Sequence, residues 1–362
     1  MSKGKSKNEK IGVGVIGLGI GKLHVQGYSQ SPNAEIVAVC DLKTDRVARA
    51  QAEAEKQGHK PNGYTDFREM MEKEKLDGII VATEVANHAG VVVPVLEAGY
   101  PCFSEKPIDA TVENVDRIVT AARKAKGLYQ VGFQRRYNPD FIAAMERLHS
   151  GALGKILFLQ GHWHFPRGFG GWVPNVEISG CRLVEQACHH MDVMSWAMKN
   201  GHPTECVGMA AITAEYPDPP RIVSEDHSAL VYRFPGDVIL SYTHQTFAPE
   251  PWCGEKLWVY GNQWGVDLSK GVLHTPDGKS EPIAGESDFY RGEVEQLEAF
   301  VANIQKGGTD KVLSNVETAR VATLMAIMGR MAFRYIVIKN DKVEVNTLEP
   351  RVIKWEDLGS TT

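Results

Sequence analysis

Hydrophobic residues in the first 130 positions form short apolar runs that alternate with longer amphipathic stretches. The runs are rich in β-branched residues, which favours buried strands, and the stretches between them have helical periodicity. The predicted strands are Ile11–Gly17, Ala34–Cys40, Gly78–Ala82, Tyr100–Ser104 and Tyr129–Gly132, and the predicted helices reach Tyr28 and cover Asp45–Gln57, Asn87–Ala98 and Val112–Lys126. Strands that alternate with helices predict an α/β fold with a doubly wound parallel sheet.

From about Lys155 the pattern changes to longer strands in which apolar and polar residues alternate. The predicted strands are Ile156–Phe165, Glu205–Glu215, His227–Phe234, Val238–Thr246 and Lys256–Tyr260, and two helices follow over Phe289–Gln305 and Asn315–Arg334. Polar turns such as Pro235–Asp237 separate the strands, which is typical of a mainly antiparallel sheet. A chain of 362 residues also exceeds one ordinary core. We therefore expect a second, α+β domain with an open sheet, and a boundary near residue 150.

Composition and charge exclude several classes of protein. Apolar residues make up 43% of the chain and charged residues 23%, which is typical of globular proteins. The net charge is −5 and lysines cluster only in residues 1–10, which we expect to be a disordered basic tail; this argues against nucleic acid as a partner. No run approaches the ~20 apolar residues of a membrane span, and no signal peptide is evident, so we expect a cytoplasmic protein.

The six cysteines are scattered along the chain without a C-x-x-C pair. Their positions are Cys40, Cys102, Cys181, Cys188, Cys206 and Cys253. Zinc-ribbon and redox-motif interpretations both need paired cysteines and are not supported. We expect reduced thiols, mostly in the core.

The first strand ends in a glycine-rich turn that indicates dinucleotide binding. Gly17, Gly19, Ile20 and Gly21 form this turn, and the third glycine comes one residue earlier than in G-x-G-x-x-G. Glycines let the chain turn tightly and approach a pyrophosphate, which then lies at the N-terminus of the following helix. We therefore expect these four residues to bind the cofactor.

Asp41 ends the second strand, 24 residues after Gly17. A carboxylate near this spacing accepts a hydrogen bond from the ribose 2′-hydroxyl of NAD and would repel the 2′-phosphate of NADP. Asp41 therefore favours NAD, while Lys43 and Arg46 just beyond it keep NADP as the alternative.

Four further segments together carry a resemblance to a known family. They are Thr83–His88, Glu105–Pro107, Gly132–Pro139 and Glu185–Asp192. As a set, over about residues 11–335, they resemble the glucose-fructose oxidoreductase and inositol dehydrogenase family (Gfo/Idh/MocA). Two positions depart from the family pattern: Glu185 replaces the more usual aspartate, and Glu84 stands where proline is common.

The resemblance implies an NAD(P)-binding Rossmann domain over residues 11–150 and a domain for substrate binding and oligomerisation over 151–362. It also implies cofactor contacts from Thr83, His88, Glu105 and Lys106. Lys106 follows the carboxyl end of a predicted strand, where ligands bind in such sheets. Partial desolvation there would lower its pKa, so Lys106 could donate a hydrogen bond to a reacting oxygen or pass on its proton.

The family's catalytic histidine corresponds to His189. Glu185, His189 and Asp192 have the spacing of one helix face, which would place carboxylates beside an imidazole acting as general base. We expect Lys106, His189 and Glu185 to be catalytic. The substrate residues that we expect are Arg136, Tyr137, Arg167, Trp172 and Asp192, of which Arg167 and Trp172 lie in a glycine-rich aromatic loop suited to a sugar.

His162 and His164 alternate along one predicted strand and so point to one face. With Glu185 and His189 they could supply ligands to a divalent metal. Most of the family needs no metal, and we favour the other explanation, that the pair consists of polar residues on a solvated or oligomer-facing sheet surface. We expect no metal.

These observations favour an NAD-dependent oxidoreductase of a sugar, a polyol or a related cyclic carbohydrate, acting as a homo-oligomer (dimer or tetramer) through its C-terminal sheet. The alternative is a redox-neutral glycosidase or lyase that retains NAD and works through a keto-sugar intermediate. A cofactor-sensing regulator is a third hypothesis, which the presence of Lys106 and His189 disfavours. Fold analogy does not choose among them, because function resides in the site.

Overall fold

The computed structural model describes residues 9–125, 127–166, 171–212, 222–283, 291–308, 310–333, 336–339, 342–345 and 352–360. Residues 1–8 of the expected basic tail and Arg167 of the expected substrate site lie outside these ranges. The chain forms two compact units. The first unit comprises Met1–Asp109, Asn114–Gln134 and Gly292–Glu317, and the second unit comprises Ala110–Glu113, Arg135–Arg291 and Thr318–Thr362. Apart from the short segment Ala110–Glu113, the chain passes into the second unit at Arg135 and returns to the first over Gly292–Glu317, whereas the sequence suggests one boundary near residue 150.

The first unit contains a parallel sheet of six strands in the order β3-β2-β1-β4-β5-β6. Its strands are β1 (Ile11–Ile16), β2 (Ala34–Cys40), β3 (Asn62–Tyr64), β4 (Gly78–Val81), β5 (Cys102–Ser104) and β6 (Tyr129–Val131). Its helices are α1 (Gly21–Gln30), α2 (Thr44–Glu55), α3 (Phe67–Lys73), η1 (Val85–Asn87), α4 (His88–Glu97), α5 (Val112–Lys124) and α9 (Glu293–Gln305). The predicted doubly wound sheet is confirmed. The short strand β3 has only one aromatic and no aliphatic residue, and the hydrophobic pattern does not reveal it.

Helix α9 belongs to the core of the first unit although it comes late in the chain. Leu297, Phe300 and Val301 are buried in the same apolar cluster as the strands β1 and β2. The ring of Phe300 meets the ring of Phe103 edge to face, with 5.9 Å between their centroids. Burial of these side chains accounts for the return of the chain.

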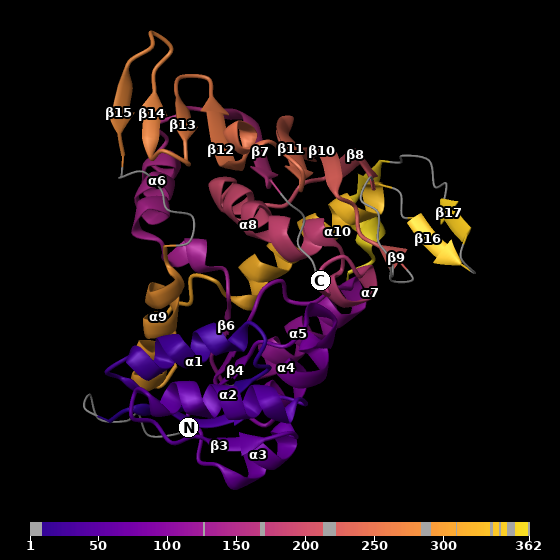
Figure 1. Cartoon of the computed structure of the whole chain (residues 1–362). Helices are drawn as coiled ribbons and strands as arrows, with labels where there is room; N and C mark the ends of the chain where they lie inside the picture. The colour runs from indigo at the N-terminus through magenta and orange to yellow at the C-terminus, as the bar shows by residue number, and fades with distance from the viewer. Residues whose placement is uncertain are drawn as a thin grey trace. The chain divides into compact units, whose positions relative to one another are not determined.

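The second unit contains a sheet of nine strands in the order β15-β14-β13-β12-β7-β11-β10-β8-β18, most of them labelled in sequence along the sheet in Figure 1. Its strands are β7 (Ile156–His164), β8 (Glu205–Ala211), β10 (His227–Phe234), β11 (Val238–Gln245), β12 (Gly254–Gly261), β13 (Gly265–Asp267), β14 (Val272–His274), β15 (Ser280–Pro282) and β18 (Ile353–Lys354). All neighbours pair antiparallel except β7 and β11. The expected mainly antiparallel sheet is confirmed.

Helices and a small sheet complete the second unit. The helices are η2 (Gln134–Tyr137), α6 (Pro139–His149), α7 (Val176–Ser179), η3 (Leu183–Ala187), α8 (Cys188–Ala197), η4 (Glu250–Trp252), α10 (Val316–Ala332) and η5 (Trp355–Leu358). The small sheet is formed by β9 (Ile222–Val223), β16 (Ile336–Lys339) and β17 (Lys342–Val345).

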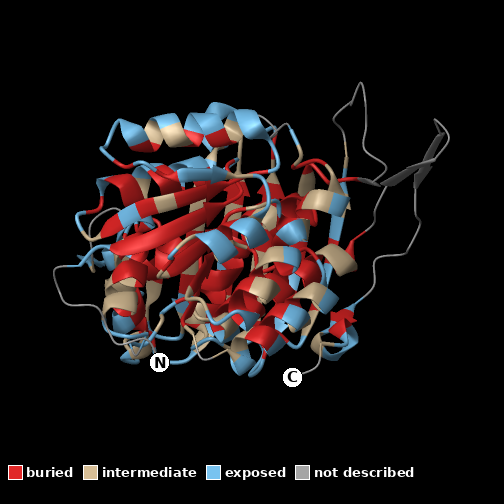
Figure 2. Cartoon of the chain, turned by 90° about the horizontal axis from the view of Figure 1, so that it is seen from below, coloured by how far each residue is buried: buried red, intermediate tan, exposed pale blue. Residues whose placement is uncertain are grey.

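The two faces of the nine-stranded sheet differ in burial. Tyr232 and Tyr242 on one face are buried, and the Tyr232 hydroxyl donates a hydrogen bond to the carbonyl of Met325 in α10. Val207 and Met209 on the other face are 39% and 68% exposed. Figure 2 shows that buried residues concentrate in the strands of the sheets. The nine-stranded sheet therefore has one helix-covered face and one open face.

All six cysteines are free, and only Cys253 is not fully buried. Among the described residues, no helix has both the length and the apolar character needed to cross a membrane.

Candidate active site

The turn after β1 has a backbone that only glycine adopts easily. Gly17 has a φ of +84°, and a Cβ atom there would lie 2.6 Å from the carbonyl oxygen of Ala82. Its N–H donates to the carbonyl of Cys40 at the end of β2, over 2.8 Å. Gly17 thus lets the chain turn beside the carboxyl ends of β2 and β4, where ligands of such sheets bind.

Helix α1 begins directly after this turn with its N-terminus open. Ile20 precedes it and provides no side-chain cap, and its first turn contains no acidic residue. A Cβ on Gly21 would lie 3.3 Å from the Cβ of Ala82, so a glycine here allows the helix to pack closely on the sheet. The N–H groups at the start of a helix fit an anion such as a pyrophosphate.

Asp41 is buried beside the glycine turn. Its Oδ2 accepts the N–H of Leu18 at 2.8 Å, and its Oδ1 accepts the N–H of Lys43 at 2.9 Å. The Nη1 of Arg46 lies 3.4 Å from Oδ2. A carboxylate has about four lone-pair sites, so these three partners leave capacity for one more donor, such as a ribose hydroxyl.

Two exposed apolar side chains flank the turn. Leu42 is 89% exposed and Ile20 is 49% exposed. Flat apolar groups such as an adenine ring could cover them. Leu42 is not evident from the sequence as a site residue, because an exposed leucine is recognised only once the fold shows that nothing covers it.

Thr83 lies in the loop after β4, and His88 is the first residue of α4. The Thr83 hydroxyl is buried and has no hydrogen-bond partner among the described residues, which makes it a candidate to bond a ligand. His88 is fully buried, with Nδ1 2.9 Å from the carbonyl of Pro107 and Nε2 3.1 Å from the carbonyl of Thr83. His88 therefore joins this loop to the segment after β5, and a contact with the cofactor remains a prediction for it.

The segment after β5 places Glu105 and Lys106 next to a histidine of α1. The Nε2 of His24 lies 2.7 Å from Glu105 Oε1, the N–H of Lys106 donates to Glu105 Oε2 at 3.1 Å, and the Lys106–Pro107 peptide is cis. Burial alone would raise the pKa of Glu105, but the hydrogen bond and charge of His24 and the charge of Lys106 outweigh it and lower that pKa. The carboxylate of Glu105 is thus ionised. His24 is a site residue that no sequence motif marks.

In the second unit, the segment that carries His189 differs from the expected helix. Residues Leu183–Ala187 form a π-helix, and the α-helix α8 begins only at Cys188. The prediction of one α-helical face from Glu185 to Asp192 is corrected, because a π-turn has i→i+5 hydrogen bonds and does not keep α-helical spacing. His189 is 8% exposed, Glu185 is half-buried and Asp192 is fully buried.

The start of this segment is held by side chains from the loop between β9 and β10. The N–H of Arg182 donates to Ser224 Oγ at 2.7 Å, and the N–H of Leu183 donates to Glu225 Oε1 at 2.8 Å. Cys181, just before them, has a φ of +116°, which is unfavourable for a residue with a side chain. These contacts set the path of the chain into the π-turn, and π-turns are frequent at functional sites.

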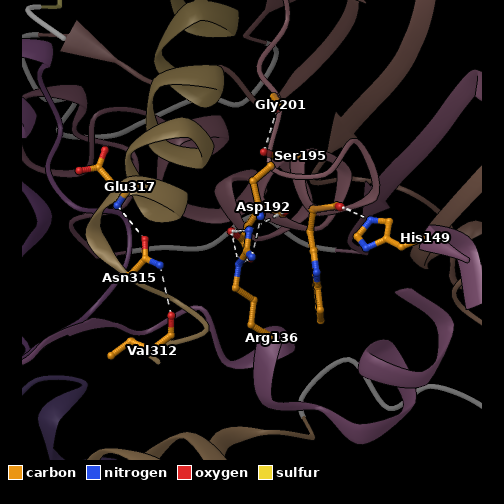
Figure 3. A network of polar contacts seen from close by, with 10 residues as sticks. Arg136, His149, Asp192, Ser195, Gly201, Val312, Asn315 and Glu317 are labelled. Atoms are coloured by element: carbon orange, nitrogen blue, oxygen red, sulfur yellow. Dashed lines mark hydrogen bonds and ion pairs between the residues drawn. The ribbon is translucent and has the colours of Figure 1, made fainter. Parts of the chain in front are cut away.

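Arg136 and Asp192, both expected to bind substrate, bind each other (Figure 3). Each oxygen of the Asp192 carboxylate lies 2.8 Å from Arg136 Nε, and both side chains are buried. Burial raises the pKa of Asp192, and the charge of Arg136 offsets this only in part. Tyr137 is also buried, and Trp172 is half-buried. Substrate contacts from these residues remain predictions.

The four residues considered above as alternative metal ligands do not form one cluster. His162 and His164 stack on each other, with ring centroids 4.3 Å apart, on the side of β7 opposite Trp163. Trp163 lies 6.1 Å from the His189 ring, centroid to centroid. Within the described ranges, no three His, Cys, Asp or Glu side chains gather as potential metal ligands.

Two family models match consecutive parts of the chain. Residues 11–133 match the "Oxidoreductase family, NAD-binding Rossmann fold", and residues 141–266 match the "GFO/IDH/MocA C-terminal domain". Together the two matches cover more than half of the chain.

Curated relatives and solved structures agree with these matches. The inositol 2-dehydrogenase of Salmonella paratyphi B is 28% identical over 223 residues, which are 60% of this chain and 64% of that protein. The structure of Lactobacillus casei myo-inositol dehydrogenase in complex with NAD(H) and myo-inositol has a TM-score of 0.73 at 20% identity and covers 94% of this chain and 98% of its own. A levoglucosan dehydrogenase complex with NADH and levoglucosan has a TM-score of 0.75 at 18% identity and covers 89% and 97%. At these identities the two structures establish the fold alone.

Proposed function

Because the chain belongs to the Gfo/Idh/MocA family of oxidoreductases with an NAD-binding Rossmann fold, we propose that it is an NAD-dependent dehydrogenase of a sugar, a polyol or a related cyclic carbohydrate. The glycine turn at Gly17, with the open N-terminus of α1 beside the buried carboxylate of Asp41, is the observation that carries the proposal. The substrate class rests on the similarity to inositol dehydrogenases and to the levoglucosan enzyme.

The residues of the first unit fit NAD. Gly17, Gly19, Ile20 and Gly21 would hold the pyrophosphate at the N-terminus of α1. Asp41 would accept a hydrogen bond from the adenosine ribose, and Leu42 would offer apolar surface to the adenine. The buried, unpartnered hydroxyl of Thr83 would bond the other half of the cofactor together with Glu105 and Lys106.

The proposed chemistry is oxidation of a hydroxyl to a carbonyl. Bound NAD supplies the hydride acceptor. His189 would accept the hydroxyl proton, while Glu185 would fix the tautomer of its imidazole. Lys106 would donate a hydrogen bond to the substrate oxygen as the carbon–oxygen double bond forms. These roles balance the reaction, because the alcohol loses one hydride and one proton.

We also propose that the second unit binds substrate and that its open sheet face joins copies of the chain into a homo-oligomer. Val207, Met209 and Val231 are exposed together on neighbouring strands of that face. Contiguous exposed apolar side chains are typical of interaction surfaces.

The test is NADH formation by the purified protein across a panel of inositols, other polyols and sugars, with sugar release followed in parallel. Wild type should reduce NAD with at least one compound, and Lys106→Ala should lose most of this activity. Lys60→Ala, which changes an exposed lysine of the same unit, is the control and should keep it. Absence of NADH formation with every compound, or full activity of Lys106→Ala, would refute the proposal. Sugar release without net NADH would support a redox-neutral enzyme instead.

A further inference from the structure

A buried polar network links three elements of the second unit to the helix of His189. The Nη2 of Arg135 in η2 contacts Glu255 Oε2 in β12, and the same oxygen lies 2.7 Å from Nε2 of His190 in α8. The hydroxyl of Tyr242 in β11 lies 3.0 Å from the other ring nitrogen of His190, Nδ1. All four side chains are buried, Arg135 at 1% and His190 at 0% exposure. An ionic network in the interior thus ends on the residue next to His189.

The chemistry of the partners fixes the direction of each hydrogen bond. Burial would raise the pKa of Glu255, but the charge of Arg135 and the hydrogen bond from His190 lower it, so Glu255 is ionised and only accepts. Nε2 of His190 therefore carries the proton, and Nδ1 accepts from the Tyr242 hydroxyl. Burial lowers the pKa of His190 to about 4, in agreement with a neutral ring. One tautomer of His190 satisfies both neighbours, which locks the orientation of the ring.

Trp163 connects the network to His189. Its indole stacks on the ring of His190, with centroids 5.0 Å apart and planes at 26°. The guanidinium carbon of Arg135 lies 5.2 Å from the centroid of the indole, within the range of a cation–π contact. The His189 ring lies 6.1 Å from the same indole. The network therefore packs against the indole of Trp163, and the same indole lies beside the ring of His189.

Helix α8 is anchored at two positions just after His189, His190 and Asp192. Arg135 reaches His190 through Glu255, and the next residue, Arg136, binds Asp192 directly. The π-turn just before α8 shifts the side chains out of the register of a continuous α-helix, and the side-chain contacts of His190 and Asp192 hold α8 in the shifted position. The two consecutive arginines, Arg135 and Arg136, thus hold α8 in place, one through Glu255 and the other directly.

We propose that Glu255 is a positioning residue, which holds His190 and Trp163 so that the imidazole of His189 is oriented for catalysis. The proposal rests on the proposed function, because it assumes that His189 is the base. A stabilising role alone explains the network less well, since buried ion pairs are often no more stable than apolar side chains of the same size. Orientation of a reacting group, in contrast, affects rate strongly: a displacement of about 1 Å can cost roughly 100-fold.

The test is Glu255→Gln, which keeps the shape of the side chain and removes its charge. We expect kcat to fall roughly 10- to 100-fold, while the KM for NAD stays within about twofold, because the cofactor residues proposed above lie in the first unit. The ring nitrogen resonances of His189, read by nitrogen-15 NMR in wild type and variant, should shift. Glu205→Gln is the matched control, because Glu205 pairs with Arg233 at the surface of the same sheet. This control should change neither kcat nor the His189 resonances.

The outcomes separate this proposal from the proposed function. If wild type reduces NAD with no compound, the proposed function fails, while the His189 resonances still show whether Glu255 orients that ring. If wild type is active, an unchanged kcat in Glu255→Gln overturns the positioning role. A lower kcat with unchanged His189 resonances also overturns it, because the loss then has another origin. If Glu255→Gln does not fold, Tyr242→Phe decides: a shift of the His189 resonances with a lower kcat supports the proposal, and no change overturns it.

Discussion

In the second unit, the guanidinium of Arg136 forms an ion pair with the carboxylate of Asp192, with Nε 2.8 Å from both carboxylate oxygens. The Nη1 of the same arginine donates to Asn200 Oδ1 at 3.0 Å, and the guanidinium carbon lies 5.2 Å from the centroid of a Trp196 ring. The sequence suggests that Arg136 and Asp192 bind a hydroxyl-rich substrate, but in the structure the two side chains bind each other. Their burial makes them first of all a structural pair.

We expect Asp192→Ala to lower the free energy of unfolding by about 3–5 kcal/mol, because it leaves the Arg136 charge buried without its partner. The measurement is urea denaturation followed by circular dichroism. Asp45→Ala serves as the control: it breaks a pair with Arg49 in which Asp45 is 60% exposed, and such pairs contribute ~0–1 kcal/mol. Equal effects of the two substitutions would contradict the structural role of the Arg136–Asp192 pair.

The sequence predicts most of the fold because the hydrophobic period is unambiguous where strands are fully buried. The strands β1 and β4 are continuous apolar runs, and the run of β2 is interrupted only by Glu35; the structure contains all three at nearly the predicted bounds. The return of α9 to the first unit is different. The helix is amphipathic, and its pattern predicts that one face is buried but does not indicate which sheet this face contacts. The contact of Phe300 with Phe103 in the structure identifies the sheet of the first unit.

The candidate site is predictable in part for similar reasons. Gly17 and Asp41 are marked by a motif whose spacing follows from backbone geometry, whereas His24 reaches Glu105 across 81 positions of sequence. The π-turn at Leu183–Ala187 has no sequence signature, and the hydrogen bonds at its start come from Ser224 and Glu225, about 40 positions away along the chain. Long-range contacts of this kind are not encoded in local periodicity.

Asp41→Asn should shift the cofactor preference toward NADP. The substitution removes the charge that would repel a 2′-phosphate, and Arg46, 3.4 Å from Asp41, would then attract that phosphate. We expect the ratio of kcat/KM for NADP to that for NAD to rise roughly 10-fold or more, which corresponds to about 1.4 kcal/mol. Asp45→Asn, on the exposed side of α2, is the control. A ratio that does not change in Asp41→Asn would show that this carboxylate does not face the ribose.

Glu105→Gln should destabilise the protein in a pH-dependent manner. The pKa of Glu105 is lowered in the fold from 4.5, so its ionised form stabilises the folded state above that value, and this contribution disappears as the pH falls through the lower folded pKa. At pH 7, loss of the charge-assisted bond with His24 should cost about 1.5–3 kcal/mol. The measurement is the free energy of unfolding of wild type and variant between neutral and acidic pH.

The difference in the free energy of unfolding between wild type and Glu105→Gln should become smaller below pH 4.5. Glu55→Gln at the exposed end of α2 provides the comparison and should have no such pH dependence. A constant difference over the whole pH range would mean that the charge of Glu105 does not contribute to stability.

Met209→Glu should weaken self-association of the chain. Met209 is 68% exposed on β8, and on the same open face Val207 pairs in register with Val231 of β10. If a second copy covers this patch, a glutamate there must be desolvated on association, which costs several kcal/mol without a partner charge. Sedimentation equilibrium should therefore show an oligomer for wild type and a shift toward monomer for the variant. Val294→Glu, at a 65% exposed position of the first unit, should leave the oligomer intact. A monomeric wild type, or a Met209→Glu variant that associates as wild type does, would exclude the open face as the interface.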